Sequence, residues 1–113
     1  MASLRLLLVL LWIAVAAVTL WAVLALGLAA APVTFVGDLA HPWRAQFYAD
    51  LEVHLLLLAA WILFREERRA VGVLCGIATL LLGALFTLPY VLLASLRSRG
   101  DPKVLLLGEK GRR

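Results

Sequence analysis

Two long stretches without a charged side chain restrict what this sequence can fold into. Residues 6–29 comprise 24 such residues and residues 70–95 comprise 26. As α-helices they would measure about 36 and 39 Å, longer than the roughly 30 Å hydrocarbon core of a bilayer. The chain is 65% hydrophobic, and its mean hydropathy is +1.01. Because a soluble domain of this size is nearer half apolar, both stretches indicate membrane spans.

A third apolar stretch lies between them, and its start is set by a proline. Pro42 suits the first turn of a helix, where a missing N–H costs nothing. A helix over residues 42–64 is about 34 Å long, whereas one starting at Leu51 would be about 21 Å and too short to cross. The sequence therefore predicts an all-α membrane protein of one integral domain, residues 1–113. It has three transmembrane helices with short connections (about 6–29, 42–64 and 70–95) and a polar tail, residues 97–113.

The N-terminal stretch has an alternative interpretation as a signal peptide, since Arg5 precedes it and small residues follow at 29–31. Signal-peptide apolar regions run about 7–15 residues, so the length favours a retained span. With three spans, the N-terminus and the charged turn at 65–69 share one side, and the tail lies on the other. The tail side has more basic residues, but the residues flanking the first spans favour the N-terminus inside.

The second span carries polar residues that a bilayer disfavours. Asp50 and His54 lie about 40° apart on one helical face, and a second stripe at i, i+4 spacing runs through Tyr48 and Glu52. Asp50 lies about 12 Å into the helix, and an Asp at the bilayer centre costs about 2.5–3.5 kcal/mol. The candidate polar site comprises Asp50, His54, Glu52, Tyr48, Trp43 and Trp61.

Three interpretations of that site stay open. The residues could form a buried pair facing the other helices, which would hold a proton, an ion or a polar ligand headgroup. They could instead form an aromatic–polar belt in the headgroup layer, or a hydrogen bond with structural value only.

The third span carries small residues at helical spacing, which let helix backbones approach closely. This stripe predicts packing against the first two helices or against a second copy: Gly72, Gly76, Thr79, Gly83 and Thr87. Pro89 should bend the helix and free the carbonyl of Leu85.

The chain lacks the motifs of common chemistries. It has no Cys-x-x-Cys, HExxH, phosphate loop or nucleophile elbow. Its single cysteine is Cys75. We therefore expect no metal and no cofactor. The net charge is +4, but the basic residues flank apolar stretches, so the expected partner is the lipid bilayer rather than nucleic acid.

The order of several residues resembles a small membrane family of unknown function found in plants and bacteria. The match runs through His41-Pro42-Trp43, Asp50, Trp61, Phe64-Arg65-Glu66, Gly83 and Tyr90, over residues 42–96. His41 departs from it, because an acidic residue is usual there. The resemblance implies that Pro42, Trp43, Asp50, Trp61 and Glu66 form a matched set, but it supplies no activity.

The sequence predicts a non-enzymatic accessory or homo-oligomeric membrane component, in the bacterial inner membrane. The alternative is a membrane-embedded enzyme or carrier of a lipid or isoprenoid that uses Asp50 and His54.

Overall fold

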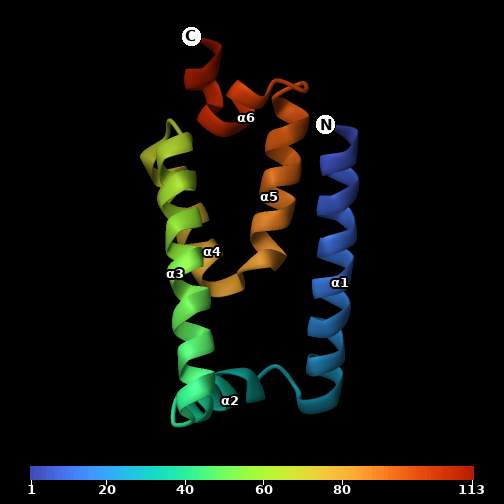
Figure 1. Cartoon of the computed structure of the whole chain (residues 1–113), viewed down its shortest axis with the longest axis vertical. Helices are drawn as coiled ribbons and strands as arrows, with labels where there is room; N and C mark the ends of the chain where they lie inside the picture. The colour runs from blue at the N-terminus through green and yellow to red at the C-terminus, as the bar shows by residue number, and fades with distance from the viewer.

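The computed structural model describes all 113 residues and contains helices only. The expectation of an all-α fold is confirmed. Two long helices, α1 (Ala2–Leu26) and α3 (Pro42–Arg65), run antiparallel along a molecule of 48 × 26 × 23 Å (Figure 1). The other elements are α2 (Ala30–Asp38), α4 (Arg69–Leu82), α5 (Ala84–Arg97), α6 (Pro102–Leu107) and the 3-10 helix η1 (Gly108–Arg112).

Both long helices have the length and composition of a membrane span. α3 begins at Pro42 after an extended residue, His41, as the proline predicted, and ends one residue beyond the expected boundary. α1 begins earlier and ends earlier than expected, because Gly27 takes φ +83° and stops the helix.

The third predicted span is not one helix. Gly83 has φ 57° and ψ −131°, a conformation open to glycine, and it divides residues 70–95 between α4 and α5. α4 runs down beside α3, and α5 turns back up beside α1 (Figure 1). The two helices form a hairpin, and three transmembrane helices are not confirmed.

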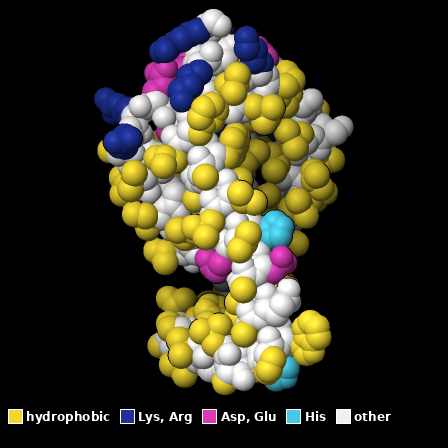
Figure 2. All heavy atoms as spheres, turned by 60° about the vertical axis from the view of Figure 1, so that its left-hand side comes forward, with side chains coloured by type: hydrophobic (Ala, Val, Ile, Leu, Met, Phe, Trp, Pro, Cys, Tyr) yellow, Lys and Arg dark blue, Asp and Glu magenta, His cyan; other side chains and the backbone are white.

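The hairpin places both chain ends at the same end of the molecule. The N-terminus, the turn between α3 and α4, and the tail lie together (Figure 1). The expectation that the tail lies opposite the N-terminus is therefore wrong, because it assumed that residues 70–95 cross. We call this the basic end, and Figure 2 shows Lys and Arg gathered on its visible face. It holds ten of the eleven basic residues: Arg5, Arg65, Arg68, Arg69, Arg97, Arg99, Lys103, Lys110, Arg112 and Arg113.

Two further segments differ from the expected loops. The expected short connection between the first two spans is mostly helix α2, which folds against α3 through an edge contact between Phe35 and Tyr48. The tail is folded, since Asp101 caps α6 by accepting a hydrogen bond from the backbone N–H of Lys103 at 2.9 Å.

The small residues of α4 lie against α3. Gly72 is buried so closely that a Cβ there would lie 3.2 Å from the Cα of Leu63, and one on Gly76 would lie 3.7 Å from the Cβ of Ala59. Thr79 and Thr87 are also buried, and Gly83 forms the hairpin bend. The stripe therefore packs within the chain.

α5 packs along α1 through polar contacts at two levels. Near the basic end, Arg5 donates to the Ser95 backbone oxygen at 2.9 Å and to its hydroxyl at 3.2 Å. Lower down, the Trp12 indole N–H donates to the Leu85 carbonyl at 3.1 Å. This is the carbonyl that Pro89 frees, so α1 supplies the donor that α5 lacks.

Candidate functional site

Asp50 and His54 lie on the outward side of α3. Their side chains are 62% and 69% exposed, and Asp50 Oδ1 lies 3.7 Å from His54 Nδ1. The same imidazole nitrogen lies 2.7 Å from the Asp50 backbone oxygen. The interpretation as a buried pair facing the other helices is therefore wrong, because the α4–α5 hairpin packs on another side of α3. No third polar side chain converges on the pair.

The pair belongs to an exposed row of side chains with heptad spacing. Trp43, Phe47, Asp50, His54 and Leu57 follow one another at intervals of four, three, four and three residues. Trp43 is 76%, Phe47 63% and Leu57 67% exposed. We call these five residues the α3 stripe. Their spacing is that of the a and d positions through which two helices pack in a coiled coil.

The polar part of the α3 stripe lies deep along the helix. At 1.5 Å per residue, His54 is about 16 Å and Asp50 about 22 Å from Arg65 at the basic end. Figure 2 shows acidic and histidine side chains at a narrow waist, between the broad basic end and the end formed by α2. The waist arises because the hairpin stops at Gly83 and leaves α1 and α3 without it below that level.

Tyr48 and Glu52, the second predicted stripe, face a different region. The Tyr48 hydroxyl donates to Asp38 at 2.7 Å, and Arg44 donates to the other oxygen of that carboxylate at 3.1 Å. With the hairpin bend, Tyr48 and Glu52 line a largely apolar cavity of about 510 Å³ between α2, α3 and the end of α4. The sequence did not point to Asp38 as a site residue, although its carboxylate joins the end of α2 to Arg44 and Tyr48 of α3.

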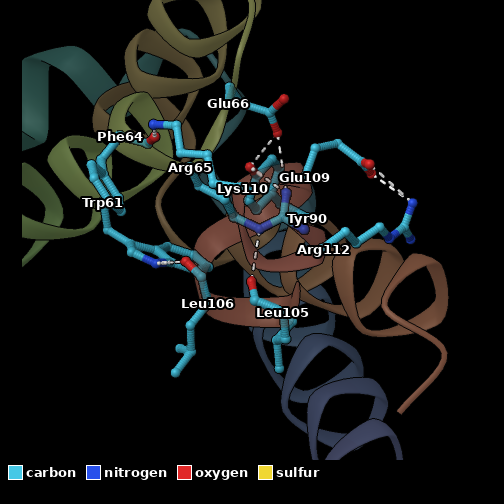
Figure 3. Close-up of polar contacts among 10 residues, drawn as sticks. All are labelled: Trp61, Phe64, Arg65, Glu66, Tyr90, Leu105, Leu106, Glu109, Lys110 and Arg112. Carbon is cyan, nitrogen blue, oxygen red and sulfur yellow. Dashed lines mark hydrogen bonds and ion pairs between the residues drawn. The ribbon is translucent and has the colours of Figure 1, made fainter. Parts of the chain in front are cut away.

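A second polar cluster joins α3, α5 and the tail at the basic end (Figure 3). The Tyr90 hydroxyl donates to Glu66 at 2.5 Å, and Arg65 donates to Glu66 at 3.3 Å and to Tyr90 at 3.2 Å. Arg65 also donates through Nε to the Leu105 carbonyl at 2.8 Å. Trp61 packs edge-on against the Tyr90 ring, and its indole N–H donates to the Leu106 carbonyl at 3.0 Å.

The tail is held onto the end of α3 by further contacts. Lys110 donates to the Phe64 carbonyl at 2.6 Å, and Arg113 pairs with Glu67 at 2.6 Å. Gly108 has φ +67°, and a Cβ there would lie only 2.6 Å from the Arg65 carbonyl oxygen. Because its polar groups satisfy one another, this cluster fixes the tail and the turn rather than presenting a reactive group.

The structure therefore separates the predicted site into three places. Asp50, His54 and Trp43 lie on the α3 stripe, Tyr48 and Glu52 line the cavity, and Trp61 belongs to the tail cluster. Of the matched set implied by the resemblance, Trp61 and Glu66 both contact Tyr90 in the tail cluster, whereas Pro42, Trp43 and Asp50 lie elsewhere on α3. The tail cluster also contains Arg65 and Tyr90, which were not among the candidate site residues, although both stand in the resembled pattern.

No protein-family model, curated protein or solved structure matches this chain. No group of three or more His, Cys, Asp or Glu side chains is placed to bind a metal ion. The resemblance stays a prediction.

Proposed function

We propose that this protein is an integral membrane protein with two spans, α1 and α3, and a hairpin, α4–α5, that enters the bilayer from the basic end without crossing it. The most apolar windows of α1 and α3 have hydropathies of 2.7 and 1.7. The 14-residue helices α4 and α5 are each about 21 Å long, less than the hydrocarbon core. The positive-inside rule assigns the basic end to the cytoplasm. The bacterial inner membrane stays a prediction.

The contacts of α1 support a retained span rather than a signal peptide. Arg5 and Trp12 hold α5 by hydrogen bonds, and Leu8 is buried in the same interface. A cleaved segment would leave the Leu85 carbonyl without its donor, and in lipid no water could replace that donor.

Within that membrane we propose a non-enzymatic role as the subunit of a homo-oligomer in which the α3 stripe binds a second copy. The observation that supports it is the outward position of Asp50 and His54 at membrane depth. An Asp facing lipid near the bilayer centre costs about 2.5–3.5 kcal/mol, and such residues normally face protein. A second protein surface over the α3 stripe removes that exposure.

A second copy fits this surface in two respects. The heptad spacing suits packing between like helices, and a polar residue at an a position of such a seam fixes register. The stripe also carries one acid and one base, so Asp50 of each copy can meet His54 of the other across a two-fold axis. An unrelated helix would need to carry both a base for Asp50 and an acid for His54.

Disulfide cross-linking in liposomes tests this proposal. In a Cys75→Ser background, Leu57→Cys places a thiol on the α3 stripe, about 12 Å from the basic end. Ile13→Cys is the matched control, since it is exposed at about the same depth on α1. We expect oxidation to link Leu57→Cys chains into dimers and to leave Ile13→Cys chains monomeric.

Charge variants complete the test. Asp50→Asn should lower the dimeric fraction about threefold to tenfold by weakening the interchain contact, while Glu52→Gln, outside the α3 stripe, should not change it. Equal cross-linking of the two cysteine variants, or none of Leu57→Cys, contradicts the homo-oligomer.

The cavity beneath the hairpin supports a second candidate function, a carrier of a lipid or isoprenoid. Its walls are mainly apolar, and Tyr48 and Glu52 supply polar groups for the head of such a ligand. Asp50 and His54 do not line this cavity, so this candidate no longer depends on them. Native mass spectrometry should then detect an apolar molecule that Leu51→Trp, a change on the cavity wall, displaces, and an empty wild-type protein contradicts this candidate function.

A further inference from the structure

The basic end holds more positive charge than its own carboxylates neutralise. Each of its four acidic residues already has a partner: Glu66 bonds Arg65 and Tyr90, Glu67 pairs with Arg113, Glu109 pairs with Arg112, and Asp101 caps α6. Five basic side chains make no ion pair and no hydrogen bond: Arg68, Arg69, Arg97, Arg99 and Lys103.

Three of these five side chains line two adjoining hollows. One hollow of about 870 Å³ contains Arg97 and Arg99, and a smaller one of about 150 Å³ contains Arg68 and Arg97. We call the two together the basic cleft, since Arg97, Val104, Glu109 and Arg112 line both. Four carboxylates also line the cleft: Glu66, Glu67 and Glu109 are in ion pairs, and Asp101 accepts the backbone N–H of Lys103. The side chains of Arg68, Arg97 and Arg99 remain available to an anion.

We propose that the basic cleft binds the phosphate headgroup of an anionic phospholipid. Guanidinium groups suit phosphate because they donate two parallel hydrogen bonds to its oxygens. The cleft lies where α3 and α5 end, at Arg65 and Arg97, which is the level of the headgroups if α1 and α3 cross the bilayer. Exposed Leu96 at its rim offers an apolar contact for the lipid backbone.

The backbone at Arg99 supports a role for its side chain. Arg99 has φ +53°, a conformation that glycine adopts without steric cost, and Gly100 follows it with φ +84°. An arginine here costs folding free energy, and its side chain makes no hydrogen bond or ion pair within the chain that would offset this cost, which supports a role for its charge toward a ligand. The same strain provides a clean variant, since Arg99→Gly removes the charge and relaxes the backbone.

Lipid binding to the full-length protein in a neutral detergent tests the proposal. The probes are short-chain phosphatidylglycerol, phosphatidylcholine and inorganic phosphate, and the measurement is the dissociation constant from thermal stabilisation. We expect phosphatidylglycerol to stabilise the protein far more than the other two. Removing two cleft charges in Arg97→Gln/Arg99→Gly should weaken its binding roughly thirtyfold, at about fivefold per charge.

The matched control is Arg69→Gln/Lys103→Gln, which removes two unpaired charges from the same end but outside the cleft. It should weaken binding less than threefold. An equal loss in both variants would mean diffuse attraction and overturn the cleft. Equal binding of inorganic phosphate would overturn the lipid as ligand, and no preference for phosphatidylglycerol over phosphatidylcholine would overturn the proposal altogether.

This proposal rests on membrane insertion but not on the homo-oligomer. Resistance of the protein to alkaline extraction from membranes reports insertion separately, and the cross-linking of α3 reports the oligomer. Loss of lipid selectivity with both of those intact would therefore count against the basic cleft alone.

Discussion

Single glycines decide the course of this backbone at the hairpin bend and at the point where the tail docks on α3. Gly83 and Gly108 combine positive φ with ψ near −131° and −146°, a region closed to residues with a Cβ. Gly83 lies in open surroundings, since an added Cβ would come no closer than 4.0 Å to Leu55. Glycine is therefore required at residue 83 for its backbone conformation alone. At residue 108 it is also required because a Cβ would collide with the backbone of Arg65.

Gly83→Ala should destabilise the protein by about 1–3 kcal/mol, because alanine pays for the strained φ and ψ without gaining a contact. Gly37→Ala is the control, since Gly37 has ordinary helical φ and free space for a Cβ, and this change should be neutral or slightly stabilising. Unfolding free energies in mixed micelles measure both. A Gly83→Ala protein as stable as the wild type would mean that the bend at residue 83 is absent.

At the scale of elements, one of the hydrogen bonds between α1 and α5 compensates for a defect in α5. Pro89 lacks the N–H that would bond the Leu85 carbonyl within α5, and the Trp12 indole replaces it from α1. In an apolar environment an unpaired carbonyl is costly, so the pairing of the two helices compensates for the defect in one.

A double-mutant cycle measures this dependence. Trp12→Phe should cost about 0.5–1.5 kcal/mol of unfolding free energy in the wild-type background. In a Pro89→Ala background the same change should cost much less, because the alanine N–H can bond Leu85 directly. Additive effects of the two substitutions would show that Trp12 contributes through packing alone.

At the scale of the molecule, the hairpin determines which groups share an end, and hence which would share a side of the membrane in the proposed topology. Three crossings would separate the tail from the N-terminus, and the basic residues would be split between both sides. Two crossings and a hairpin gather ten basic residues at one end and leave Arg44 alone at the other, as the positive-inside rule favours.

Reporter fusions in cells distinguish the two topologies. We expect a fluorescent protein at the C-terminus to fluoresce and alkaline phosphatase there to be inactive, because the proposed topology places the tail in the cytoplasm. Phosphatase inserted after Gly37, between the two spans, should be active. Activity at the C-terminus together with fluorescence at the N-terminus would restore the three-span topology.

The sequence could predict much of the individual helices. The start of α3 followed from Pro42, the freed carbonyl from Pro89, and close helix packing from Gly72 and Gly76, since these are local effects of proline and glycine. The break at Gly83 could not be predicted, because glycine is tolerated within apolar helices and hydropathy does not change there. The sequence also could not predict that Asp50 and His54 are exposed. Helical periodicity shows which residues share a face, but not which elements pack against that face.

By itself, the sequence determined an all-helical chain, the position of its two long apolar helices and the face that carries Asp50 and His54. These follow from local backbone preference and from the 3.6-residue repeat. Only the tertiary structure decided that residues 70–95 fold back and that the tail docks beside Arg65 and Tyr90. Both depend on contacts between residues that are distant in sequence. Such contacts form, and stabilise the fold, only when the helices are packed together.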